Sequence, residues 1–421
     1  FLVSYKNYDN IKGSILYFII LLLPLFLILG NGITNSALAI VFIIYIIECF
    51  RNKKILFNNT FEFKIFVIFY IYLIFNSFIS NNIESSLVRT TGYIKYFIFV
   101  LVYLDFFKIY KKYLKVGIVW ILIIVLLNFD IIYQSIFGKD IFGYDTGNYA
   151  RNSGFFFDEL IAGGYLLGLS FLSFSLINFD NRIKFSYLFI LLCLLACILS
   201  GERSNTIKFL IIFFLFSLLI LNINPKNIKK YLLIFIISII SISSIVYYKS
   251  EQLKIRYFET ISFSSNNNLS LVDQYLTSAY GAHTLSAYFV FKENYLLGVG
   301  NKNFRFECNY VEDKVRKVQT EIDQSNINLP SGCSTHPHQI YNELFSEHGI
   351  VGTILLITLI LILIINRLKN RNLSKLNIVS LLYLIVVFIP ILPAGSFFTT
   401  FNSTLFWINF LFFLLNEKIK S

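Results

Sequence analysis

Apolar runs long enough to cross a lipid bilayer recur along the whole of this 421-residue chain. A membrane-spanning helix needs about 20 predominantly apolar residues, and the runs at 14–30, 115–134 and 349–366 approach or reach that length. Hydrophobic residues make up 56% of the chain and charged residues only 14%, which is too apolar a balance for a soluble globular protein. The sequence therefore predicts an all-α, polytopic membrane protein.

The distribution of lysine and arginine predicts which side of the membrane each loop faces. We expect about twelve membrane helices, at 14–30, 35–50, 63–80, 92–107, 115–134, 159–178, 185–200, 204–222, 230–248, 349–366, 376–394 and 401–416. Basic clusters precede the first helix and follow the second, fourth, sixth, eighth, tenth and last, so all fall on one side. Because cytoplasmic loops carry an excess of lysine and arginine, this side and both termini are predicted to be cytoplasmic.

One long segment, 249–348, precedes the tenth helix and is predicted to lie on the periplasmic side. Three regions follow: helices one to nine in 1–248, a periplasmic loop with short helices in 249–348, and the last three helices in 349–421. The formal net charge of +12 is assigned to the cytoplasmic loops, so no nucleic-acid partner is expected.

The stretch 334–352 holds three of the four histidines of the chain, where a polar segment meets an apolar one. Pro337 suits the first position of a helix, which would place His336 at or near the N-cap. On such a helix His338 and Asn342, four residues apart, lie together. Two glycines, at 349 and 352, would let the chain break or pack closely before the apolar run that follows.

Two arginines stand close to the predicted outer surface of the membrane. Arg151 lies just before the sixth expected helix, and Arg203 lies in the tight turn between the seventh and eighth. Charges near the bilayer are costly and tend to be functional. A structural interpretation stays open for each arginine. In it, Arg203 extends toward the membrane surface and pairs with Glu202, and Arg151 is an ordinary loop charge.

The cysteines leave one question open. Cys308 and Cys333 both lie in the long outer segment, where an oxidising compartment would allow a disulfide. Spacing alone does not decide whether they pair.

Motifs of several other enzyme classes are missing from the sequence. It contains no Walker loop, no His-Glu-x-x-His, no Gly-x-Ser-x-Gly and no Asp-x-Asp. His336 and His338 have no further cysteine or carboxylate at the usual ligand spacing, so no metal is expected. No other cofactor is expected either.

The remaining chemistry is histidine, arginine and carboxylate beside the membrane. Arginine matches phosphate oxygens, and histidine takes a proton from a hydroxyl near neutral pH. This set suits a lipid-linked diphosphate leaving group attacked by a sugar hydroxyl. The alternative for His338 is a structural histidine at the helix end. Glu343 is a candidate to assist His338, although helical spacing turns it away.

Four motifs together resemble the O-antigen ligase and polymerase superfamily of bacterial inner-membrane glycosyltransferases. Residues 151–155 (Arg-Asn-Ser-Gly-Phe) resemble its Arg-x-Ser-Gly-Phe segment, and 200–204 (Ser-Gly-Glu-Arg-Ser) resemble its Ser-Gly-Ser-Arg-Ser/Thr turn. Residues 297–300 (Leu-Gly-Val-Gly) resemble its Gly-Val-Gly turn. The most specific match is His-Pro-His-Gln at 336–339 with Glu-x-Gly-x-x-Gly at 347–352, similar to a His-x-His-Asn…Glu-x-Gly-x-x-Gly signature.

The resemblance implies transfer of a glycan from undecaprenyl diphosphate at the periplasmic face of the inner membrane. The acceptor would be lipid A–core in a ligase, or another lipid-linked repeat unit in a polymerase. The essential histidine of the family corresponds to His338, and its phosphate-binding arginine corresponds to Arg203. This chain departs from the pattern at Gln339, where asparagine is usual, and at Glu202, where a small residue is usual. The anion of Glu202 would weaken the binding of the diphosphate by Arg203.

Further substrate-binding positions are expected around these two residues. The candidates are Arg151, Arg256, Arg305, His336, Asn342 and Glu347. A different reading, a transporter of polysaccharide or lipid-linked glycan, is favoured by twelve helices. It is disfavoured because repeated halves and ionisable groups near the midplane are not evident.

Overall fold

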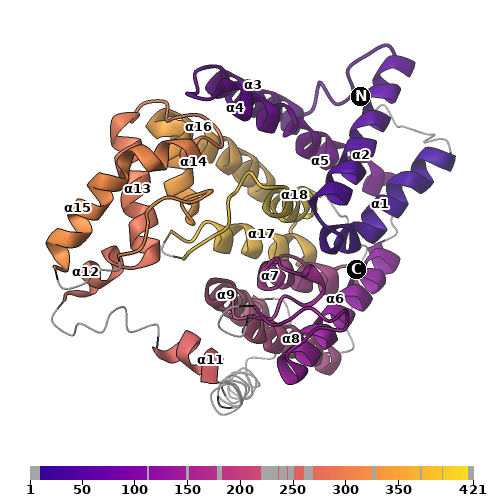
Figure 1. The fold of residues 1–421 in the computed structure, drawn as a ribbon. Coiled ribbons are helices and arrows are strands. Elements are labelled where there is room, and N and C mark those ends of the chain that lie inside the picture. The colour runs from indigo at the N-terminus through magenta and orange to yellow at the C-terminus, as the bar shows by residue number, and fades with distance from the viewer. Residues whose placement is uncertain are drawn as a thin grey trace.

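The structure, a computed structural model, is helical throughout its described part (Figure 1). The residues that it describes are 10–110, 113–147, 151–177, 183–219, 236, 244, 251–259, 269–324, 329–369, 372–390 and 392–415. Within these ranges the chain forms no β-strand beyond two isolated bridges, Lys139 with Asp145 and Gly147 with Arg151. The all-α prediction is confirmed for these residues.

Eleven of the described helices lie where membrane helices are expected. They are α1 (Asn10–Ile28), α2 (Asn31–Arg51), α3 (Phe61–Phe78), α5 (Ile94–Ile109), α6 (Tyr113–Phe137), α7 (Ala162–Ser175), α8 (Ile183–Leu199), α9 (Arg203–Leu219), α16 (Ile340–Lys369), α17 (Lys375–Val387) and α18 (Thr400–Leu414). The helix expected at 230–248 falls almost entirely outside the described residues. Among the described helices five, α1, α2, α3, α6 and α16, are long and apolar enough to cross a membrane. The number of spans and their orientation stay predictions.

Shorter elements connect these helices. They are α4 (Ile83–Thr91), η1 (Gly154–Phe156), α11 (Glu251–Lys254), η2 (Ile255–Glu259), α12 (Leu271–Leu276), α13 (Ala279–Glu293), α14 (Phe304–Glu307), η3 (Cys308–Val311) and α15 (Glu312–Ile322). Serine caps set two of the starts: the hydroxyl of Ser270 accepts from Asp273 N before α12, and that of Ser278 accepts from Gly281 N before α13.

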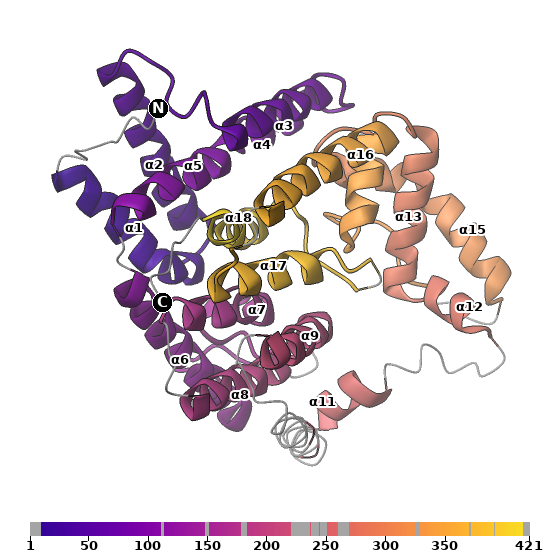
Figure 2. The ribbon, with the colours of Figure 1, turned by 180° about the vertical axis from the view of Figure 1, so that it is seen from behind.

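The helix α18 lies at the centre of the bundle, next to α17, α5 and α7 (Figures 1 and 2). Its Trp407 ring packs edge-on against Phe66 and Phe97, and its indole Nε1 donates to the hydroxyl of Tyr93 over 2.9 Å. Helices in lipid lack a hydrophobic driving force for association. The edge-to-face rings and the hydrogen-bonded indole N–H stabilise this contact instead.

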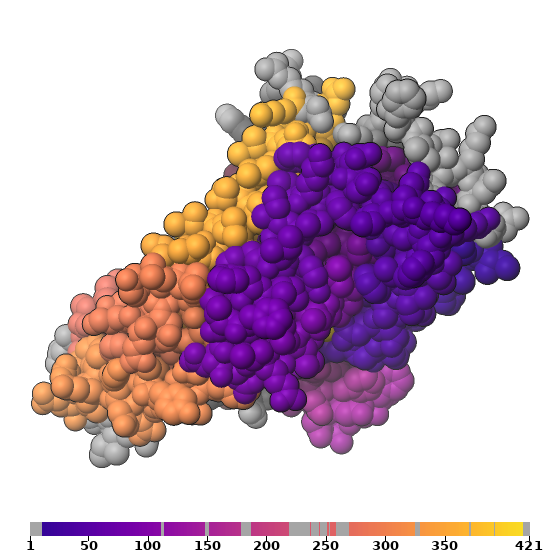
Figure 3. Space-filling view, turned by 90° about the horizontal axis from the view of Figure 1, so that it is seen from above, coloured from indigo at the N-terminus to yellow at the C-terminus, as the bar shows by residue number. Residues whose placement is uncertain are grey.

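The elements α12 to α15 form a lobe beside the bundle (Figures 1 and 2). From above, its orange surface projects away from the indigo N-terminal helices (Figure 3). The lobe, residues 269–324, has a small core of its own that includes Val290, Phe304 and Val311. Its α13 packs along α16, so the lobe is attached to the helix that follows the histidine motif.

The predicted break at Gly349 is confirmed. Its φ of 63° interrupts α16, and a Cβ there would lie 2.4 Å from the backbone of Leu296. The turn at 297–300 therefore packs directly on the break, where Val299 N donates to Ser346 O over 3.0 Å and Gly300 N donates to Glu347 O over 2.9 Å. Only glycine permits both the positive φ and the close approach.

Candidate active site

One large cavity lies between the bundle and the lobe, with a volume of about 1100 Å³. Its walls come from α7, α9, α13, α17 and α18 and from the segments at 336–340 and 392–397. Arginine and histidine line one part of it. Farther along α9, α17 and α18 the walls are apolar, and they include Leu210, Val387, Leu405 and Phe406. A cavity with a cationic part and an apolar part matches an amphipathic, anionic ligand.

Three arginines gather around the turn at Gly201, and we call them the arginine cluster: Arg151, Arg203 and Arg256. Gly201 has a φ of 71°, and a Cβ there would lie 3.0 Å from Cγ of Arg151 and 3.4 Å from Nε of Arg256. The missing side chain thus lets two arginines pack over the turn. Arg256 Nε donates to the Gly201 carbonyl, and Arg203 Nη1 donates to Arg256 O over 3.2 Å.

The arginine cluster concentrates positive charge at the cavity. Burial lowers the pKa of Arg256, and the neighbouring Arg151 and Arg203 lower it further. Like charges held this close repel one another, so a bound anion would relieve the repulsion. Arg151 keeps its place through Nη2, which donates to Leu160 O over 3.0 Å.

His338 lies on the same cavity but not on a helix, so the prediction of a helix starting at Pro337 is wrong. α16 begins at Ile340, and His338 has a φ of 52°. Gln339 caps the helix: its Oε1 accepts from Asn342 N over 2.8 Å. The backbone carbonyl of His338 accepts from Ala394 N over 2.8 Å, which fixes the left-handed turn from outside.

Two further imidazole rings and one tyrosine ring lie close to His338. The His338 ring centroid lies 4.1 Å from that of His336 and 4.8 Å from that of His283, and the Tyr280 ring lies 6.2 Å away. His283 Nδ1 lies 3.1 Å from Gly332 O. Because a carbonyl only accepts, Nδ1 of His283 carries a proton and donates it to this contact.

Burial is the main cause that lowers the pKa of His336 to about 4 and that of His338 to about 3. The other histidines add to both shifts, as do Lys302 and Arg305 for His336. Both imidazoles are therefore neutral at pH 7 and are available as proton acceptors.

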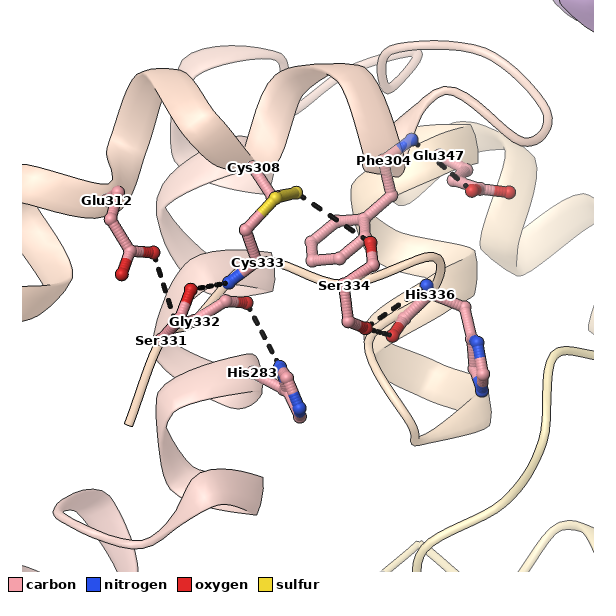
Figure 4. Close-up of a disulfide and its surroundings, with 10 residues drawn as sticks. All are labelled: His283, Phe304, Cys308, Glu312, Ser331, Gly332, Cys333, Ser334, His336 and Glu347. Atoms are coloured by element: carbon pink, nitrogen blue, oxygen red, sulfur yellow. Dashed lines mark hydrogen bonds between the residues drawn. A yellow bond between two sulfur atoms is a disulfide. The ribbon is translucent and has the colours of Figure 1, made fainter. Parts of the chain in front are cut away.

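A disulfide between Cys308 and Cys333 holds the histidine segment to the lobe (Figure 4), with Cα atoms 5.0 Å apart. The sequence left this pairing open. Figure 4 shows the bond next to the contact between His283 and Gly332 and before the turn that carries His336. The disulfide spans 25 residues of sequence, and it ties η3 and the adjoining α14 to the segment that precedes His338.

The segment 392–397 connects the two parts of the site. On one side Pro393 O accepts from the hydroxyl of Ser204 and from Lys208 Nζ, both on α9. On the other side Ala394 N donates to His338 O, and Phe397 N donates to Glu343 Oε2 over 2.7 Å. The helix that begins at Arg203 and the loop that carries His338 are therefore held by one short piece of chain.

A comparison with models of protein families found a match within the chain. Residues 188–357 match the family model described as O-antigen ligase. Over these residues the chain is similar to the O-antigen ligase family. The resemblance predicted from the motifs is confirmed, and the matched region includes Arg203, Arg256, His283 and His338. No curated protein matches the chain.

The match to the O-antigen ligase family supports a ligase- or polymerase-like membrane glycosyltransferase. Together with its apolar helices, it makes the chain a multi-pass protein of the bacterial inner membrane. Its substrates are a lipid-linked glycan and a glycan acceptor.

The two departures of this O-antigen ligase homologue from the family pattern both have structural partners. Glu202 Oε1 accepts from Gly163 N and its Oε2 accepts from Asn205 Nδ2, each over 2.6 Å. Burial raises the pKa of Glu202, and these two hydrogen bonds oppose the shift. Glu202 thus faces the first turn of α7, where the helix dipole favours an anion. Gln339 caps α16, as described above, and donates from Nε2 to Pro390 O over 2.6 Å.

Five of the eight predicted site residues line the cavity, and three do not. The five are Arg151, Arg203, Arg256, His336 and His338. Arg305 lies on α14 and acts on His336 only through its charge. Asn342 Nδ2 donates to the hydroxyl of Thr284 over 3.0 Å and so joins α16 to α13. Glu347 is fully buried and accepts from the backbone N of Lys302 over 2.7 Å, which holds the lobe.

Four residues of the site were missed in the sequence. Tyr280 and His283 lie on one face of α13, and the spacing of three residues was a signal for them. Lys208 lines the cavity from within the otherwise apolar part of α9, where any lysine is notable. Lys302 gave no such signal, because its buried partner Glu343 is far away in the sequence. Glu343 binds Lys302 and the 392–397 segment rather than the His338 ring.

The lowered pKa values predict that acid destabilises the protein through its histidines. Between pH 6.5 and about 4 the unfolded chain binds protons at His336 and His338 that the folded chain does not, so the free energy of unfolding falls with pH. Above pH 7 both states are neutral at these residues and the contribution is flat. Thermal unfolding in detergent at pH 7.5, 6.5, 5.5 and 4.5 measures the effect. A His336→Gln, His338→Gln double variant should lose less stability on acidification, and equal losses would contradict the prediction.

Proposed function

We propose that this protein transfers a glycan from undecaprenyl diphosphate to an acceptor hydroxyl at the periplasmic face, as an O-antigen ligase does. One observation carries the proposal: the arginine cluster and His338 line a single cavity that also has a mainly apolar part. The cationic part suits the diphosphate, and the apolar part suits the first units of the polyprenyl chain.

In this proposal His338 is the general base. Its neutral imidazole takes the proton of the acceptor hydroxyl while that oxygen bonds to the anomeric carbon of the donor sugar. The bond between this carbon and the diphosphate oxygen breaks, and its electron pair leaves with undecaprenyl diphosphate. The negative charge of the diphosphate would raise the low pKa of His338, which improves the base when the donor is bound.

Arg203, Arg151 and Arg256 stabilise the departing diphosphate. Guanidinium groups form paired, charge-assisted hydrogen bonds to phosphate oxygens. Because three of them converge before any substrate arrives, little reorganisation is needed as charge develops on the leaving group. We propose that this cluster supplies the charge neutralisation without a metal ion. His336 borders the same space and is proposed to contact the substrate.

The disulfide supports the periplasmic placement of the lobe. Disulfides form and persist in the bacterial periplasm, whereas cytosolic thiols are kept reduced. The bonded pair of Cys308 and Cys333 lies in the segment that the distribution of lysine and arginine assigns to the outer side. Two independent features thus favour the same orientation, with both termini cytoplasmic.

Reconstitution of the purified protein tests the proposal. Vesicles would contain an undecaprenyl-diphosphate glycan donor and, in separate samples, lipid A–core or a second lipid-linked repeat unit. Release of undecaprenyl diphosphate with glycan on lipid A–core is the expected result. Extension of the lipid-linked unit alone would assign a polymerase. Movement of the intact donor across the vesicle membrane without release of diphosphate would mean a transporter and would contradict the proposal.

A further inference from the structure

Lys208 is a buried cation on the wall of the proposed active site. It belongs to α9, five residues after Arg203, and is 3% exposed. Its Nζ donates to Pro393 O over 3.2 Å. In the described part of the chain, no carboxylate oxygen is found within 4.0 Å of this Nζ.

The buried lysine Lys302, in contrast, has a carboxylate partner. Lys302 Nζ, on a side chain that is 4% exposed, pairs with Glu343 Oε1 over 3.2 Å. An ammonium taken out of water costs several kcal/mol unless an anion or several hydrogen bonds compensate. A single carbonyl compensates Lys208 only in part, so an anionic ligand in the cavity would complete its environment.

The position of Lys208 separates it from the arginine cluster along the helix axis. Five residues of α-helix rise by about 7.5 Å, so Lys208 starts farther into the bundle than Arg203, and both residues border the same cavity. Leu210 on α9 and Tyr383 on α17 also line this cavity. A cation at this depth faces the end of the diphosphate that carries the lipid.

We infer that Lys208 binds the lipid-proximal phosphate of the donor, while the arginine cluster binds the phosphate that carries the sugar. This inference rests on the proposed function. It divides recognition of the diphosphate between two parts of the site: Lys208 binds the phosphate that every polyprenyl phosphate carries next to its lipid, and the arginine cluster binds the second phosphate, which only the diphosphate has. The hydrogen bond to Pro393 keeps that ammonium at the boundary between the cationic and apolar parts.

The test compares binding of undecaprenyl diphosphate and undecaprenyl phosphate to the purified full-length protein in detergent. The wild type is expected to bind the diphosphate more tightly. Lys208→Gln keeps an N–H donor for Pro393 but removes the charge, and it should weaken diphosphate binding about 10- to 100-fold, the range of one charge-assisted hydrogen bond. Binding of the monophosphate should weaken by a similar factor, because its only phosphate is the lipid-proximal one. Arg203→Gln should instead weaken binding of the diphosphate and leave that of the monophosphate within a few-fold. Lys208→Arg should keep the affinity for both lipids within a few-fold.

Lys292→Gln is the matched control, because it removes one positive charge from an exposed position of α13. It should leave both affinities unchanged. Weakening of the diphosphate alone by Lys208→Gln, or no weakening of either lipid, would overturn the inference and leave the proposed function intact. If the wild type binds neither lipid while its thermal unfolding is normal, the proposed function itself fails.

Discussion

Replacement of His338 by alanine is expected to reduce glycan transfer by about 100- to 10,000-fold, the usual contribution of a general base. The reason is geometric: His338 lines the cavity together with the arginine cluster, and its ring is neutral in the absence of substrate. The arginines and Lys208 are untouched by the substitution, so binding of undecaprenyl diphosphate should persist within a few-fold. Release of diphosphate from reconstituted vesicles measures the rate, and a separate titration measures binding.

His283→Ala is the control for this experiment. Its ring packs against His338, yet it faces Gly332 O and does not border the cavity. It should slow transfer far less than His338→Ala does. If both variants lose activity to the same degree, or if His338→Ala transfers at the wild-type rate, His338 is not the base.

Replacement of Glu343 by alanine is expected to destabilise the fold by about 3–5 kcal/mol, because it leaves a buried charge without its partner. The Glu343 side chain is 1% exposed, and it also accepts from Phe397 N. The substitution therefore leaves the ammonium of Lys302 and a backbone N–H unsatisfied together. Thermal unfolding in detergent measures the loss.

A surface pair supplies the matched control. Glu293 pairs with Lys314, and these side chains are 47% and 53% exposed. Glu293→Ala should cost less than about 1 kcal/mol, because water screens an exposed pair. A Lys302→Met, Glu343→Leu double variant should recover part of the loss of Glu343→Ala. Similar losses for Glu343→Ala and Glu293→Ala would contradict the buried ion pair.

The positions of the helices could be predicted from the sequence because apolar runs of membrane length are a local property. The broken α16 was predictable for a similar reason, since Gly349 sits between a polar and an apolar stretch. The family motifs, read together, also led to Arg203 and His338 before any geometry was known. These residues lie in segments whose spacing is itself the signal.

The conformation of His338 could not be predicted in this way. Pro337 is a good first residue for a helix, but the chain starts the helix three residues later, after the Gln339 cap. The deciding contact, from Ala394 to the His338 carbonyl, joins residues that are far apart in the sequence. The same holds for Glu343: it was a candidate to assist His338 although helical spacing turned it away, and its partners in the structure are Lys302 and Phe397 N. Long-range hydrogen bonds thus set the details of the site.

The disposition of the 392–397 segment has a mechanical consequence. The proposed base, His338, and the proposed phosphate-binding residue Lys208 belong to different stretches of the chain, and this short segment hydrogen-bonds to both. Moving His338 away from Lys208 therefore requires breaking the hydrogen bonds of this segment. The length of the segment 392–397 thus sets the distance between the proposed base and the bound diphosphate. An insertion into this segment would therefore lengthen the distance between His338 and Lys208.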